Sequence, residues 1–246
     1  MRWSCARITA ILLFFTAFAP AAQELGQGLA KYRSGDFLGA LRDLMPLAEQ
    51  GDATAQTVIG VIYADGLGVV RDNVAAASWM RRAAEQEQVL AQLNLGEMYE
   101  RGQGVDEDFT EAAGWYERAA YLGHEVAQYN LGRMYEQGVG IDQDFAEAAK
   151  WYRSAAEQDH APAQTSLGVM YTTGQGVAQD LGDAIIWFRR AAEQGHALAQ
   201  YNLGLMHVRG TGMTEDHGEA ANWFRRAADG GHAAAQTSLG TMYFRG

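Results

Sequence analysis

The strongest constraint on the fold is an Ala-Gln dipeptide that recurs six times at one fixed interval of 36 residues. Its glutamines are Gln56, Gln92, Gln128, Gln164, Gln200 and Gln236. A glycine follows each glutamine four residues later, and tryptophan keeps the same period from Trp79 to Trp223. A period without drift predicts a repeat protein in which each unit is one supersecondary element.

The first half of each unit has the pattern of an amphipathic helix. In the third copy, apolar residues stand at i, i+4, i+7 and i+8: Ala127, Leu131, Met134 and Tyr135. Gly132 lies beside this stripe, so we expect a neighbouring helix to approach closely there. Gly138 and Gly140 follow the stripe, and glycine there is typical of a helix C-terminus.

The second half of each unit predicts a second helix. Asp144 is placed as its N-cap, with Glu147 three residues later, and Asp108 and Asp216 repeat the device. The apolar stripe of this helix consists of Ala148, Trp151, Tyr152, Ala155 and Ala156. We therefore expect the tryptophan series in the core. Asp159, or its glycine equivalents Gly123, Gly195 and Gly231, turns the chain into the next unit.

Neither helix can bury its stripe alone, so the units are expected to stack into an all-α solenoid of antiparallel helix pairs. The expected divisions are a signal peptide over 1–22, a short helix pair over 23–51, repeats over 52–87, 88–123, 124–159, 160–195 and 196–231, and an incomplete sixth repeat over 232–246.

The repeated run of Ala-Gln, Leu-Gly, Met-Tyr, Gly-x-Gly and Trp-Tyr or Trp-Phe resembles the Sel-one-like repeat (SLR), a relative of the tetratricopeptide repeat, over roughly residues 24–246. The resemblance implies a right-handed α-solenoid that serves as a scaffold for binding. Exported bacterial members act as adaptors, envelope regulators or host-interaction proteins. A cysteine-rich subgroup staples each repeat with a disulfide, and this chain lacks those cysteines.

The N-terminus has the three-part layout of a secretory signal peptide. Arg2 and Arg7 precede the apolar run from Ile8 to Phe18, and small residues follow up to Ala22. The run is too short to span a bilayer about 30 Å thick. Cleavage would place the mature chain in the periplasm or outside the cell; the alternative is an anchor that is not cut.

Charge and cysteine content exclude several functions. The formal net charge is −11, and loss of Arg2 and Arg7 would make it more negative. Such a chain repels phosphate backbones and anionic lipids, so we expect neither nucleic acid nor a membrane as partner. The single cysteine, Cys5, would leave with the signal peptide, and disulfides with it.

Metal, phosphate and catalytic sites were each considered from the sequence, and a structural role is favoured over each of them. Histidines recur at the start of successive first helices (His124, His160, His196 and His232). Stacked units lie about 8–10 Å apart, too far to share one metal ion. The Gly-x-Gly pairs resemble a phosphate-binding loop, but such a loop follows a strand and begins a helix, whereas these pairs end a helix. A β-lactam-binding enzyme would be expected to carry a Ser-x-x-Lys pair, and the only two lysines, Lys31 and Lys150, do not stand three residues after a serine. We predict no catalytic, metal or cofactor site, and a non-enzyme.

The first helices carry a second face, at positions equivalent to residues 57, 61 and 64, which we call the groove face. Core positions stay nearly constant between copies, whereas these positions change. We expect them to be exposed and to bind a protein or extended peptide, since tyrosine and arginine often anchor interfaces. The proposed residues are Leu93, Glu97, Glu100, Tyr129, Arg133, Glu136, Val169, Tyr201, Leu205 and Phe244.

The sequence therefore predicts an exported protein-binding scaffold, with a role in envelope regulation. One alternative is a secreted host-interaction factor, and another, of a different class, is an envelope enzyme acting on cell-wall peptides. The sixth unit has no second helix, because Gly246 corresponds to the glycine that ends the first helix elsewhere. That pattern favours a longer natural chain over self-association through the uncapped end.

Overall fold

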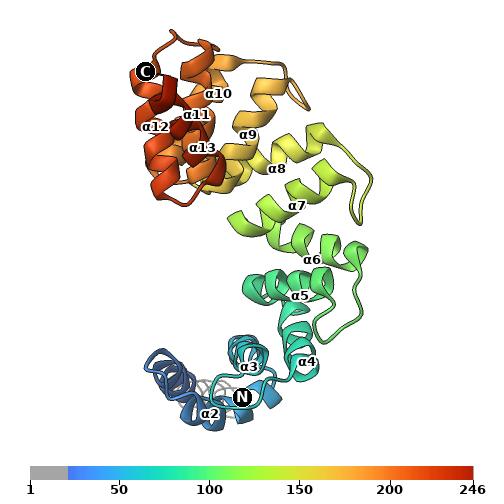
Figure 1. The fold of residues 1–246 in the computed structure, drawn as a ribbon. Helices are drawn as coiled ribbons and strands as arrows, with labels where there is room; N and C mark the ends of the chain where they lie inside the picture. The colour runs from blue at the N-terminus through green and yellow to red at the C-terminus, as the bar shows by residue number, and fades with distance from the viewer. Residues whose placement is uncertain (1–21, 246) are drawn as a thin grey trace, which may run out of the picture. The chain divides into compact units, whose positions relative to one another are not determined.

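The structure is a computed structural model that describes residues 22–245. The expected signal peptide lies outside the described residues, apart from Ala22. The described chain contains thirteen helices and no strand (Figure 1). A helix over 22–33 is followed by α2 (Phe37–Glu49), α3 (Ala53–Asp65), α4 (Asn73–Ala84), α5 (Val89–Arg101), α6 (Phe109–Tyr121), α7 (Glu125–Gln137), α8 (Phe145–Glu157), α9 (Ala161–Thr173), α10 (Leu181–Glu193), α11 (Ala197–Arg209), α12 (His217–Asp229) and α13 (Ala233–Arg245).

The chain forms two compact units whose boundary falls inside α6, unit 1 through Arg118 and unit 2 from Ala119. Within each unit, a helix packs on the next helix along the chain: α2 to α5 in unit 1, and α7 to α13 in unit 2. The odd-numbered helices from α3 are the first helices of the repeats, and the even-numbered ones are the second helices. This is the all-α solenoid that the sequence predicts.

The helices are short. Each helix from α2 to α13 has 12 or 13 residues, or about 20 Å at 1.5 Å per residue. Among residues 22–245, no helix combines the length and the apolar character needed to cross a bilayer.

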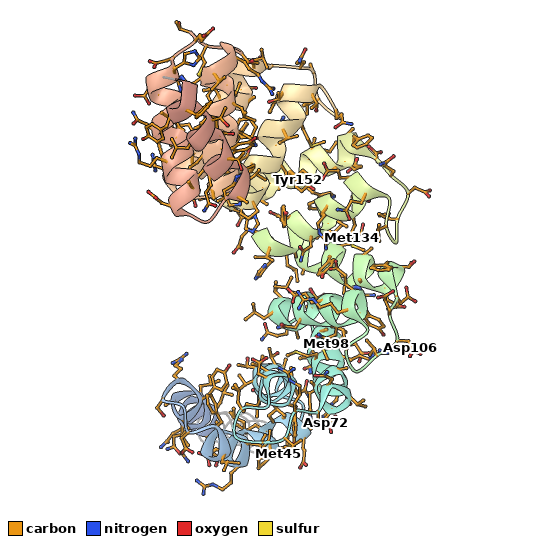
Figure 2. All side chains as sticks on the ribbon, in the orientation of Figure 1. Met45, Asp72, Met98, Asp106, Met134 and Tyr152 are labelled. Carbon is orange, nitrogen blue, oxygen red and sulfur yellow. The ribbon has the colours of Figure 1, made fainter. Side chains whose placement is uncertain are left out.

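The predicted caps are present. Asp144 Oδ1 accepts hydrogen bonds from the backbone N–H groups of Ala146 and Glu147 at 2.8 and 3.0 Å, which satisfies N–H groups that have no partner inside the helix. Asp72, labelled in Figure 2, caps α4 in the same way. Gly138 ends α7 in the left-handed conformation with φ of 68°, which favours glycine.

The repeated glycine lets an aromatic ring reach the first helix. A Cβ atom added at Gly132 would lie 2.8 Å from Cδ1 of Tyr152, which is 1% exposed and labelled in Figure 2. Gly168 receives Phe188 in the same manner. The predicted close approach at Gly132 is therefore confirmed, and the second helix of each of these repeats supplies the ring.

The prediction that the tryptophan series fills the core is confirmed for Trp115, which is 8% exposed. It is wrong for the other members, which are only half-buried: Trp79, Trp151, Trp187 and Trp223. The residue after Trp151, Tyr152, takes the core position. Successive helix residues point about 100° apart, so the two neighbouring rings face different surroundings, and in this repeat Trp151 lies at the rim. In the second repeat both rings are buried, with Trp115 8% exposed and Tyr116 0%.

The ring of Trp151 contacts Tyr121 edge-on, with centroids 5.2 Å apart. In most other repeats an arginine covers the tryptophan, as Arg226 does 4.5 Å above Trp223.

The repeated glutamine ties one repeat to the one before it. The buried Gln164 donates through Nε2 to the carbonyl of Ala156, near the end of the preceding second helix, at 3.0 Å. Its Oε1 accepts from Gln194 at 2.8 Å. Gly230 stands where Gln194 stands one repeat earlier, and there Oε1 of Gln200 has no partner in the described structure. The repeated glutamine thus adds a second hydrogen bond to a carbonyl at the helix end, since the carbonyl of Ala156 also accepts from the backbone N–H of Asp159 at 3.1 Å.

Candidate peptide-binding surface

The groove face has three positions on each first helix, and these positions differ in how far their side chains are buried. The first position, equivalent to residue 57, is mostly buried. Leu93 is 9% exposed, Thr57 6% and Thr165 2%, so the expectation that these positions face solvent is wrong for them. Each stands three residues before the repeated glycine and therefore shares its buried face.

Tyrosine at the first position is half-buried for an additional reason. The ring of Tyr129 packs 4.9 Å from His160, and that of Tyr201 packs 4.6 Å from His232, measured between ring centroids. Both histidines immediately precede the first helix of the following repeat. These tyrosines hold adjacent repeats together, and only part of each ring is open to a partner.

Two members of the histidine series, His160 and His232, cap the helices that follow them, whereas His124 and His196 make no capping hydrogen bond. Nδ1 of His160 accepts from the backbone N–H of Ala163 at 3.3 Å, and Nδ1 of His196 lies 2.8 Å from Oγ1 of Thr165. Burial lowers the pKa of His160 and of His196 below the ordinary histidine value. Within residues 22–245, no three histidine, cysteine or acidic side chains come together as a metal site would require.

The second and third positions are more open. Val169 is 38% exposed, Leu205 and Arg133 are half-buried, and Phe244 is 92% exposed. Glu136 and Glu100 accept hydrogen bonds from the hydroxyls of Tyr152 and Tyr116, at 2.6 and 2.7 Å.

Burial, followed by the bond to Glu136, raises the pKa of Tyr152 far above its usual range. The tyrosine hydroxyl stays protonated and holds one oxygen of the carboxylate in place. The two glutamates are therefore oriented by the core beneath them.

A cavity of about 250 Å³ lies in unit 1 beside α3, α4 and α5. Its lining is rich in charged and amide groups. Glu97 and Arg101 form an ion pair at 3.7 Å, one helical turn apart, and Asp65 and Arg71 also line it. The charged groups of this cavity are of both signs.

A second cavity of about 200 Å³ lies in unit 2 beside α9, α10 and α11, and its lining is different. Val169, Phe188, Leu205 and Met206 provide apolar walls. Its polar lining residues are Thr172, Thr173, Asn202, Thr211 and Arg209, of which only Arg209 is charged.

A third cavity, of about 450 Å³, is bordered by α11, α12 and α13. Leu205 and Val208 from the groove face line it, together with Phe224 and Met242. The apolar character of the second cavity therefore continues along unit 2, and Leu205 belongs to both.

The structure thus brings Val169 and Leu205 together at one cavity and places Glu97 at another. The groove face as defined from the sequence also includes Thr172, which lines the same cavity as Val169 and Leu205, but it leaves out Asn202 and Arg209. Asn202 and Arg209 stand one residue after the first and third groove positions, so a three-position pattern leaves them out. The only sequence signal was that residue 209 changes from repeat to repeat, as the groove positions do.

A repeat solenoid whose core is constant and whose first helices line cavities with changing residues belongs to the class of repeat scaffolds that typically mediate protein–protein interaction. The Sel1 repeat model matches residues 53–87, 89–124, 126–160, 161–196, 197–232 and 233–246, and the chain belongs to the Sel1 repeat family. A search of curated proteins found no match to the chain.

Two solved structures are similar over most of the chain. One is a protective antigen present in uropathogenic Escherichia coli strains that displays an SLR fold, with 33% identity and a TM-score of 0.86. The match covers 92% of this chain and 49% of the antigen, so the chain spans about half of that protein's length. The other is a Sel1 repeat protein from Oxalobacter formigenes, with 33% identity, a TM-score of 0.84 and coverage of 89% and 88%.

Proposed function

We propose that this Sel1 repeat protein is an exported scaffold that captures a protein or an extended peptide on its groove face, in the service of envelope regulation. The observation that carries the proposal is the partly open apolar surface of Val169 and Leu205, two groove residues that line one cavity. Apolar side chains that remain accessible in a concave surface are typical of binding sites.

The test uses a photo-crosslinking residue placed at Val169, with a matched position at Ile186 on the second helix α10. Ile186 is 56% exposed, more than Val169, but lies outside the groove face. We expect crosslinks to a defined partner from position 169 and none from position 186. The double substitution Val169→Glu and Leu205→Glu should abolish them while leaving the helix content unchanged.

Equal crosslinking from both positions, or persistence in the double variant, would contradict the groove proposal. In either case the binding surface would have to be sought on the second helices.

The export part of the proposal rests on the basic, apolar and small-residue segments before Gln23. Expression of the full chain in a Gram-negative host should yield a periplasmic or secreted product that begins after Ala21 or Ala22. Mass spectrometry of the N-terminus checks this, and a mature product that retains Arg2 and Arg7 would refute it.

A host-facing role is the second candidate, because the E. coli structure that is similar at 33% identity is described as a protective antigen of uropathogenic strains. The two roles differ in the crosslinked partner. An envelope protein of the producing cell supports regulation, and a eukaryotic protein supports the host-facing role. We propose no catalytic function.

A further inference from the structure

The cavity beside α9, α10 and α11 combines apolar walls with a single cation. No acidic side chain lines it, although the chain as a whole carries a formal charge of −11. Arg209 forms no ion pair, hydrogen bond or ring contact within the described residues. An arginine left unpaired in an acidic protein offers a site for an anion from outside the chain.

The matched arginine of unit 1 shows that this arrangement is specific to unit 2. Arg101 ends α5 at the same repeat position at which Arg209 ends α11. Arg101 pairs with Glu97 four residues earlier, at 3.7 Å, whereas Leu205 stands four residues before Arg209. The position thus keeps its arginine in both repeats, and only in α11 does its intrahelical partner become apolar.

The remaining polar groups of the cavity also suit a carboxylate. The side-chain amide of Asn202 makes no hydrogen bond in the described structure, and its N–H groups can donate to an oxygen. The guanidinium of an arginine can donate two parallel hydrogen bonds to a carboxylate.

The combination of a cation and apolar walls in about 200 Å³ selects one part of a peptide. In an extended chain, successive side chains point in opposite directions, so an acidic residue and its apolar neighbour cannot enter the same small cavity. The last residue of a chain is different, since its carboxylate and its side chain leave the same Cα atom.

We propose that this cavity binds the C-terminal residue of an extended peptide, with the carboxylate on Arg209 and an apolar side chain against Val169, Phe188 and Leu205. This inference rests on the proposed function, because it names the ligand of the groove face in unit 2. The cavity binds the C-terminal residue of the peptide, and the adjoining surface of Leu205 contacts the residues that precede it.

The test uses the full mature chain and a library of hexapeptides immobilised through their N-termini, synthesised once with free C-terminal carboxylates and once as C-terminal amides. We expect selection of free-acid peptides that end in leucine, isoleucine, valine or methionine. Amidation should weaken binding about 10- to 100-fold, as expected for loss of hydrogen bonds to a charged group. Arg209→Gln should produce a similar loss, and Arg209→Lys should restore part of it.

Arg101→Gln is the matched control, because it removes an arginine from the same helix position in unit 1, and it should leave binding unchanged. Thermal unfolding of each variant checks that the fold is retained. If folding fails in Arg209→Gln, the amide library still decides, because it uses the unaltered protein.

Binding of amides and acids with equal affinity, or equal binding by Arg209→Gln, would overturn the inference. If such binding is nevertheless lost on Val169→Glu and Leu205→Glu, the groove function stands without the end-recognition site. If no peptide binds, the inference fails, while the photo-crosslink from position 169 still tests the proposed function by itself.

Discussion

The cavity of unit 1 and the α9–α11 cavity of unit 2 are built from equivalent elements and differ in what they can bind. In unit 1, Glu97 forms an ion pair with Arg101 at 3.7 Å, so that arginine has a partner within its own helix. In unit 2, Leu205 replaces the glutamate and Arg209 is left for a ligand. Among several differences between the two linings, the change from glutamate to leucine on a first helix is the one that removes the arginine's intrahelical partner.

The largest expected effect concerns the ring that closes the unit 2 cavity from below. Phe188 is 2% exposed and packs against Gly168. Phe188→Ala should lower the free energy of unfolding by about 3–5 kcal/mol, because it removes a buried ring and leaves a void. Urea unfolding monitored by circular dichroism measures the loss.

The neighbouring Trp187 is the control for that prediction. It is half-buried beneath Arg190, whose guanidinium lies 4.9 Å from the ring centroid. Trp187→Ala should cost about 1–2 kcal/mol, since less apolar area and only a partly exposed cation–π contact are lost. A larger loss from Trp187 than from Phe188 would show that the core assignment is inverted.

The next effect tests the comparison directly by exchanging the residue that stands four positions before the arginine in each cavity. Leu205→Glu places a carboxylate four residues before Arg209, as Glu97 stands before Arg101, so the arginine should pair within its own helix. Binding of free-acid peptides should fall about tenfold or more. Fluorescence anisotropy with a peptide selected from the library provides the measurement.

The reverse exchange, Glu97→Leu, should give unit 1 a weak preference for free-acid peptides. The gain should be smaller than the loss in unit 2, because Asp65 still lines the unit 1 cavity. If Leu205→Glu leaves binding intact, the glutamate in unit 1 is not what closes that site.

A third difference lies in the side chains under the repeated glycines. A Cβ atom at Gly168 would lie 2.7 Å from the rigid ring of Phe188, whereas one at Gly60 would lie 2.9 Å from the terminal methyl of Met80. Methionine can move aside, but the ring cannot without displacing its helix.

We therefore expect Gly168→Ala to destabilise the protein by about 1–2 kcal/mol, even after the gain of about 1 kcal/mol that alanine brings to a helix. Gly60→Ala should be close to neutral. Thermal unfolding of the two variants side by side decides the point, and an equal loss from both would show that Met80 is as rigid as Phe188.

The features that sequence reasoning recovered are those set by local rules. The cap at Asp144, the end of α7 at Gly138 and the close approach at Gly132 each follow from the preferences of one residue type. An apolar stripe is about 100° wide or more, which is the angle between neighbouring helix residues. The sequence pattern therefore does not distinguish whether Trp151 or Tyr152 reaches the core.

The site was recovered less completely, because cavity walls come from several elements. Leu93 was expected in solvent because it lies outside the apolar stripe of its helix, yet it shares the face of Gly96 and is buried. Arg209 and Asn202 become part of a candidate site only because Val169 and Phe188, on other helices, line the same cavity. No spacing within one helix could have assembled that set.

The smallest expected effect is a difference in acid stability between the two units. The first helices of unit 1 begin at Asp52 and Gln88, whereas α9 and α11 in unit 2 begin at His160 and His196. The pKa of His160 is lowered chiefly by burial and further by His196 and His124, against an opposing effect of the Glu125 carboxylate. Protonation of Nδ1 would also turn the acceptor for the Ala163 N–H into a donor.

Because the folded-state pKa lies below the unfolded value of 6.5, the stabilising neutral form is fully present above about pH 6.5 and is lost as the pH falls through the folded pKa. Hydrogen exchange should therefore show faster opening of α9 at pH 5.5 than at pH 7.5, with little change in α3, after correction for intrinsic rates. The effect should be modest, since the half-exposed ring is partly solvated. His160→Asn keeps a capping side chain without a titrating group and should abolish the difference. Acid sensitivity that persists in α9 of this variant, or that is equal in α3, would place its cause elsewhere than at this histidine.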